Sequence, residues 1–122
     1  MDYKEEIIQH YKYPQNFGEM EAPDKTVREA NASCGDMVEV QVRFRIEDLA
    51  LRILEVRWRG VGCAISTAAA SMLSEKVKGM SKADLEKFGE AGVVEMLGGE
   101  INPGRMKCAT LAYKAILKVF EK

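Results

Sequence analysis

The clearest pattern of apolar and polar residues is an alternation in the middle of the chain. From Val38 to Ile46 every second residue is apolar, and the residues between them are charged or polar. A second run with the same period ends near Trp58, and an acidic turn at Glu47-Asp48 separates the two runs. A period of two is typical of a half-buried strand. The sequence therefore predicts an antiparallel hairpin with one face in the core and one face in water.

Apolar residues at helical spacing flank this hairpin on both sides. Pro14 ends the first such stretch, Gly79 stands where a helix C-cap glycine belongs, and Ser81 with Asp84 forms a capping box. We expect helices at residues 2–13, 63–78, 81–88 and from about 104 to the end, with a further turn at 93–97. The pattern predicts an α+β fold, in which a small antiparallel sheet of about three strands carries helices mainly on one face.

Length and charge narrow the classes of protein. The 122 residues are 47% hydrophobic and 30% charged, which is typical of one soluble domain covering residues 1–122. With 18 basic and 19 acidic side chains, no basic excess favours binding to nucleic acid or to an anionic membrane. The first residues are too acidic for a signal peptide, and no apolar run approaches the roughly 20 residues that span a bilayer. We therefore expect a cytoplasmic protein.

Three cysteines carry the candidate chemistry. An odd number in a reducing compartment does not form a disulfide framework, which leaves metal ligands, a reactive thiol or core packing. Each cysteine lies near the start of an expected element: Cys34 precedes the first long strand, Cys63 begins a helix, and Cys108 lies in the first turn of the last helix. Because a helix N-terminus carries positive partial charge, we expect a lowered pKa for the thiols of Cys63 and Cys108.

Thiolates are soft ligands that suit zinc or an iron–sulfur cluster, and both usually take four ligands. Asp36, two residues after Cys34, is the strongest candidate for the fourth ligand; the alternative is that it only shapes the turn. The single histidine, His10, belongs to the first helix, and we expect it to pack or to form a hydrogen bond and not to bind the metal. Lys107 has no lone pair as an ammonium ion, so we expect it to supply positive charge beside Cys108.

Four segments together resemble the IscU/SufU/NifU N-terminal family over nearly the whole chain. Cys34-Gly35-Asp36 is similar to its first cysteine motif. The other three are His10-Tyr11 with Pro14 and Asn16, Gly62-Cys63-Ala64-Ile65-Ser66, and Lys107-Cys108-Ala109-Thr110-Leu111-Ala112. A single such motif would mean little, but three cysteine motifs in this order, in a chain of this length, are specific.

The resemblance implies an α+β fold with the cysteines clustered at one end and Cys34, Asp36, Cys63 and Cys108 as ligands. It also implies a pyridoxal-phosphate-dependent cysteine desulfurase as the partner that delivers persulfide sulfur. In the IscU branch these positions assemble a [2Fe–2S] cluster for carrier or apo-acceptor proteins, and the third cysteine, here Cys108, accepts the sulfur. In the SufU branch they hold Zn²⁺, and the first cysteine, here Cys34, relays sulfur as a sulfurtransferase.

This chain departs from both branches. Lys107 stands where IscU proteins have histidine, as in SufU proteins, and residues 101–105 lack the LPPVK segment that a dedicated chaperone reads. The spacing between the second and third cysteine motifs leaves no room for the SufU insertion. We therefore favour a scaffold, not itself an enzyme, over a zinc-dependent sulfurtransferase, and leave open a monomer or a homodimer bridged by a cluster. A structural zinc module is disfavoured because the chain has no close Cys-x₂₋₄-Cys pair.

Overall fold

The computed structural model describes residues 3–32 and 35–121. Within these residues the chain forms a three-stranded antiparallel sheet in the order β1-β2-β3, together with four α-helices and one short 3₁₀ turn. The elements are α1 (Tyr3–Lys12), β1 (Lys25–Asn31), β2 (Asp36–Glu47), β3 (Ala50–Val61), α2 (Ala64–Lys76), α3 (Lys82–Met96), η1 (Pro103–Arg105) and α4 (Met106–Lys118). The predicted α+β class is confirmed.

The predicted hairpin corresponds to β2 and β3. Its register places Val40 opposite Trp58 and Val42 opposite Val56, and a bulge follows Arg43. Most apolar positions of the alternation face inward and are buried, as the sequence pattern predicts: Val38, Val40, Val42, Val56 and Trp58. Ile46, beyond the bulge, and Leu54, at the bulge, are instead 77% and 48% exposed. The outward positions carry arginines and glutamates that pair with one another across the strands.

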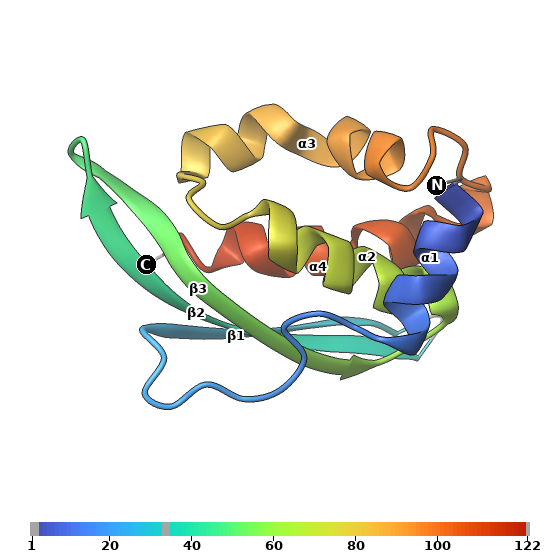
Figure 1. Ribbon diagram of the computed structural model, residues 1–122, viewed down its shortest axis with the longest axis horizontal. Coiled ribbons are helices and arrows are strands. Elements are labelled where there is room, and N and C mark those ends of the chain that lie inside the picture. The colour runs from blue at the N-terminus through green and yellow to red at the C-terminus, as the bar shows by residue number, and fades with distance from the viewer. Residues whose placement is uncertain (1–2, 33–34, 122) are drawn as a thin grey trace.

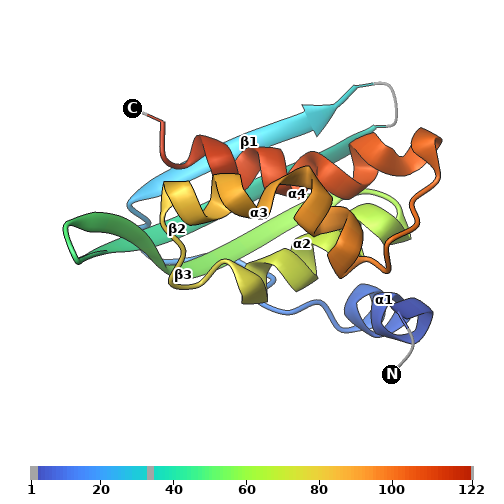
Figure 2. The same ribbon diagram turned by 90° about the horizontal axis from the view of Figure 1, so that it is seen from above.

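The helices cover one face of the sheet in two further layers (Figure 1). Helices α2 and α4 lie side by side on the sheet, and α3 lies over them, as the second view also shows (Figure 2). Helix α1 packs beside α2 at one end. The core between sheet and helices is made of buried aliphatic side chains, among them Val40, Val42, Ile53, Val56, Leu73 and Ile116. The expected one-sided packing of helices is confirmed.

Several helix boundaries differ from the expected ones. Cys63 is the N-cap of α2 and not its first residue. The capping box of Ser81 and Asp84 is present, but α3 runs on to Met96 across a kink at Gly89, whose φ of 62° breaks the helical conformation. The break directly follows Phe88, so the expected end of a first helix there is confirmed, and glycine adopts this φ at little cost. The helical residues after the break, up to Met96, correspond to the expected further turn at 93–97.

Helix α1 is less buried than its apolar stripe suggested. Ile7 packs against the core, whereas Ile8 and Tyr11 are 40% and 50% exposed. The helix lies at the edge of the helical layer, so only one side of it has a neighbour. Among the described residues, no helix is long and apolar enough to cross a membrane.

Candidate metal centre

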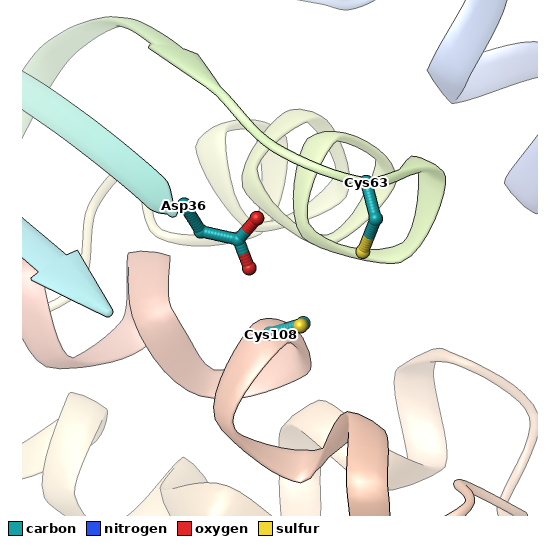
Figure 3. A group of neighbouring side chains, drawn as sticks. All are labelled: Asp36, Cys63 and Cys108. Carbon is teal, nitrogen blue, oxygen red and sulfur yellow. The ribbon is translucent and has the colours of Figure 1, made fainter. Parts of the chain in front are cut away.

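Three side chains from distant parts of the sequence meet at one end of the sheet. Asp36 is the first residue of β2, Cys63 precedes α2, and Cys108 lies near the start of α4. One carboxylate oxygen and the two sulfur atoms all lie within 4.8 Å of one another. Figure 3 shows the three side chains directed toward a common space. Cys34, the remaining predicted ligand, lies outside the described residues.

The topology explains this convergence. Because β2 and β3 are antiparallel, the first residues of β2 and the last residues of β3 lie at the same end of the sheet, where Met37 pairs with Val61. The chain then passes Gly62 and enters α2, so Cys63 stands beside the beginning of β2. Since α4 lies alongside α2 and also begins at this end, the N-termini of two helices face the same space. Their positive partial charges favour anionic ligands there.

The three side chains of the centre differ in how far they are buried. Asp36 is 4% exposed and Cys108 is 3% exposed, whereas Cys63 is half-buried. The Oδ2 atom of Asp36 is buried and has no hydrogen-bond partner among the described residues. A buried carboxylate oxygen without a partner costs free energy that a bound cation would recover. The donor set of two thiols and one carboxylate therefore fits a metal ion or an iron–sulfur unit.

The two described cysteines differ in acidity. Burial tends to raise the pKa of the Cys63 thiol, but the backbone amide of Ser66 and the Cys108 thiol stabilise its thiolate, so the pKa is lowered on balance. For Cys108, a hydrogen bond to the Asp36 carboxylate, burial and the neighbouring Cys63 together raise the pKa to about 12. In the metal-free chain Cys108 therefore holds its proton.

The expectation that the helix N-terminus and Lys107 would lower the pKa of Cys108 is wrong for this metal-free structure. Cys108 lies two residues inside α4 and faces a carboxylate that accepts its proton in a hydrogen bond. Cys63 occupies the N-cap position; its side chain makes no capping hydrogen bond, but the backbone amides of Ser66 and Ile65 favour its thiolate and lower its pKa. Two things therefore decide which thiol ionises: its position at the helix N-terminus and the presence of a carboxylate facing it.

The other two predicted residues lie around this cluster. Lys107 is exposed, on the side of α4 where it lines a small pocket with Glu29 and Lys114. Its electrostatic role remains a prediction. His10 lies within 2.6 Å of the Ser71 hydroxyl through Nδ1 and 3.6 Å from a carboxylate oxygen of Glu75, which agrees with the expected hydrogen-bonding role.

Sequence reasoning passed over two residues that frame the cluster. Ser66 donates its hydroxyl to the backbone oxygen of Cys63 at 3.1 Å, and the same hydroxyl stabilises the Cys63 thiolate. Gly62 lies close to both Ser66 and Asp36. Both residues belong to the second cysteine motif, which was the only sequence signal for them.

Comparisons with known proteins give a matching family and similar sequences. Residues 2–122 match the family described as the NifU-like N-terminal domain. The chain is 37% identical over 119 residues to the bifunctional protein NifU/MnmA of Rubrobacter xylanophilus, covering 98% of this chain but 24% of that protein. It is 30% identical over 119 residues to the iron–sulfur cluster assembly scaffold protein IscU of Escherichia coli K12, covering 95% and 89% of the two chains.

Solved structures share the same architecture. A protein described as an iron–sulfur cluster assembly scaffold for the SUF system of Fervidobacterium islandicum aligns with a TM-score of 0.74 at 26% identity, over 92% of this chain and 91% of that one. The N-terminal part of a NifU-like protein from Brucella abortus aligns with a TM-score of 0.73 at 16% identity, over 96% and 90%. The second likeness shows the fold alone.

Proposed function

Because the chain belongs to the NifU-like N-terminal domain family, we propose that it is a scaffold on which a labile [2Fe–2S] cluster is assembled. In this proposal a pyridoxal-phosphate-dependent cysteine desulfurase supplies the sulfur, and carrier or apo-acceptor proteins receive the cluster. The cargo is held by Cys34, Asp36, Cys63 and Cys108. The protein acts in the cytoplasm, as a monomer or as a homodimer bridged by the cluster.

One observation carries this proposal: a carboxylate oxygen and two sulfur atoms lie within 4.8 Å of one another, while Asp36 Oδ2 has no partner among the described residues. Three thiolates and a carboxylate around a core of formal charge about +2 would give about −2 overall. The N-termini of α2 and α4, together with Lys107, offset part of this charge. A carboxylate is a harder ligand than a thiolate and holds iron less firmly, which suits cargo that must leave.

The chain's own groups must rearrange when cargo binds. Cys108 loses its thiol proton, so binding weakens as the pH falls. Asp36 then exchanges its hydrogen bond from Cys108 for the metal. Cys108 remains the predicted sulfur acceptor once iron is bound. In the metal-free chain, Cys63 is the better nucleophile of the two described cysteines, because it is more exposed and its pKa is lowered.

A zinc-dependent sulfurtransferase is the second candidate. It is favoured by Lys107, which stands where the IscU branch has histidine. In this alternative the same four side chains hold Zn²⁺, and Cys34 receives persulfide from the desulfurase and passes it on. The chain would then be an enzyme of sulfur transfer that builds no cluster itself.

Metal and acid-labile sulfide analysis of protein purified without oxygen separates the two functions. Iron with equimolar sulfide supports the scaffold, and stoichiometric zinc without sulfide supports the sulfurtransferase. A desulfurase pulse on the wild-type protein and on variants that each lack one cysteine, followed by peptide mass spectrometry, gives a second readout. Persulfide on Cys108 in the iron-loaded protein supports the scaffold, whereas persulfide on Cys34 only when zinc is present contradicts it.

A further inference from the structure

Gly62 joins β3 to α2 and directly precedes Cys63. Six other described glycines have a positive φ, between 62° and 136°, and Gly62 is not among them. Its backbone conformation is therefore open to any residue, and conformational freedom does not explain a glycine here. The reason must be the space that a side chain would occupy.

That space is already filled by two side chains of the candidate metal centre. A Cβ atom on Gly62 would lie 2.1 Å from Ser66 Oγ, 2.9 Å from Asp36 Oδ1 and 3.2 Å from Asp36 Cγ. Real Cβ atoms essentially never approach other heavy atoms to within 3.0 Å. Even the single methyl group of alanine would therefore have to displace both the Ser66 hydroxyl and the Asp36 carboxylate.

Gly60, two residues earlier, is crowded in a different way. A Cβ there would lie 2.1 Å from the backbone oxygen of Met37 and 3.0 Å from the Cα of Val38. Those contacts belong to the β2–β3 pairing, in which Val38 is opposite Gly60. Gly60 thus permits strand pairing, whereas the three nearest atoms at Gly62 all belong to side chains of the candidate centre.

Other contacts also hold the side chains of Asp36 and Ser66 in place. Asp36 is 4% exposed, and its carboxylate accepts a hydrogen bond from Cys108. Ser66 is tied to the backbone oxygen of Cys63 at 3.1 Å. A methyl group on Gly62 would therefore push against a carboxylate that is buried and has little room to move.

We propose that Gly62 is a positioning residue for metal binding, because its missing side chain keeps the Asp36 carboxylate in place as an oxygen ligand beside Cys63 and Cys108. This inference rests on the metal site of the proposed function. Groups that orient metal ligands typically change metal affinity about 10- to 100-fold when they are altered. We expect Gly62→Ala to weaken metal binding by roughly that factor.

The test is a titration of the metal-free protein with Co²⁺ and Zn²⁺, with affinities from chelator competition and the Co²⁺ absorption spectrum as a second readout. Gly62→Ala is compared with Asp36→Ala and with the double variant. If Gly62 acts through the carboxylate, the double variant binds as Asp36→Ala does, and Gly62→Ala shares the altered cobalt ligand-field bands of Asp36→Ala. Gly104→Ala is the matched control, because a Cβ there meets only Asn102 Oδ1, at 3.3 Å.

A second variant keeps the test informative if Gly62→Ala fails to fold. Gly62→Ala with Ser66→Ala removes the 2.1 Å overlap but keeps the 2.9 Å approach to Asp36. It should fold, as judged by circular dichroism, and still bind Co²⁺ more weakly than Ser66→Ala alone. Wild-type affinity and spectrum for Gly62→Ala would overturn the inference, as would a double variant with Asp36→Ala that binds more weakly than Asp36→Ala. A wild-type chain that binds neither metal would instead refute the metal site itself.

Discussion

Two buried carboxylates lie three residues apart on β2 and differ in their hydrogen-bond partners. Asp36 and Glu39 are 4% and 6% exposed. Glu39 accepts hydrogen bonds from Arg28 at 2.8 and 3.0 Å and from Arg59 at 3.1 Å. Asp36 keeps one oxygen without a partner among the described residues. A carboxylate that its own chain has satisfied is structural, whereas one that it leaves unsatisfied is available to a ligand from outside.

The strand register accounts for the difference. Arg28 on β1 and Arg59 on β3 lie directly opposite Glu39, one on each side. Opposite charges in such cross-strand positions stabilise a sheet. Asp36 lies at the end of the strand and on the other face, because side chains alternate along β2. Its neighbours there are the N-termini of α2 and α4 with Cys63 and Cys108, the other candidate metal ligands.

The largest expected effect is the stabilisation of the native state by a bound metal ion. At a free Zn²⁺ concentration about 1,000 times the dissociation constant, binding stabilises the native state by about 4 kcal/mol. We expect a correspondingly large rise in the unfolding temperature of the wild-type protein, and a smaller one for Asp36→Asn. The measurement is thermal unfolding followed by circular dichroism, with and without Zn²⁺.

Glu39→Gln is the control for that experiment, because it alters a buried carboxylate on the same strand but outside the centre. Its unfolding temperature should start lower and rise by the same increment as that of the wild type. An equal loss of the increment in both variants would mean that Asp36 has no special relation to the metal.

The sequence predicted the parts of this comparison that depend on periodicity and local motifs. The alternation from Val38 to Ile46 is enough to specify β2 and the buried face of its first half, although Ile46 is 77% exposed. The three cysteine motifs were enough to expect a shared centre. Cys63 and Cys108 do lie together with Asp36 in the structure. Cys34 lies outside the described residues, so its place in the centre stays a prediction.

Properties that depend on residues distant in the sequence could not be predicted. One face of the hairpin was expected to lie in water, yet Glu39 on that face is 6% exposed. Arg28 of β1 and Arg59 of β3 flank it, which follows from a register that one strand alone does not reveal. The shift in the pKa of Cys108 was predicted with the wrong sign, because the prediction counted the helix terminus and Lys107 but not a hydrogen bond from the thiol to the Asp36 carboxylate.

Without metal, the substitution of Glu39 should lower the free energy of unfolding more than the substitution of Asp36 does. Glu39→Gln leaves Arg28 and Arg59 with an uncharged partner, and loss of charged hydrogen bonds of this kind costs about 1–3 kcal/mol. Asp36→Asn removes a buried charge that lacks a full set of partners, so the free energy of unfolding should stay the same or rise slightly. Urea unfolding of both metal-free variants measures the difference. A greater loss for Asp36→Asn would contradict the view that the metal-free chain leaves this carboxylate unsatisfied.

Thiol alkylation tests the influence of Asp36 on its neighbour. A pKa of about 12 for Cys108 makes its thiolate scarce at pH 8, although the lower nucleophilicity of more acidic thiolates offsets part of the difference. In a metal-free Cys34→Ser background, we expect iodoacetamide to modify Cys63 at least about tenfold faster than Cys108. Asp36→Asn should speed the modification of Cys108, and Glu39→Gln should not. Peptide mass spectrometry over time gives both rates, and equal rates in the parent chain would contradict the assigned acidities.

The smallest effect is the pH dependence of the Glu39 contribution. The hydrogen bond from Arg28, aided by Arg59 and opposed by burial, lowers the pKa of Glu39 below its ordinary value of 4.5. A carboxyl whose pKa is lower in the folded state stabilises the protein above its unfolded pKa, and this stability is lost as the pH falls through the folded value. The difference in unfolding free energy between wild type and Glu39→Gln should therefore be constant from pH 8 to about 5.5 and shrink below 4.5.

Glu19→Gln is the matched control for this pH series, because Glu19 pairs with the same Arg59 but its side chain is 64% exposed. An exposed ion pair contributes about 0–1 kcal/mol, so this variant should follow the wild type at every pH. Urea unfolding of the three metal-free proteins at pH 7, 5.5, 4.5 and 3.5 provides the comparison. If the Glu39→Gln difference persists undiminished at pH 3.5, the arginines stabilise the fold through shape and packing, and the charge of Glu39 is not what sets it apart from Asp36.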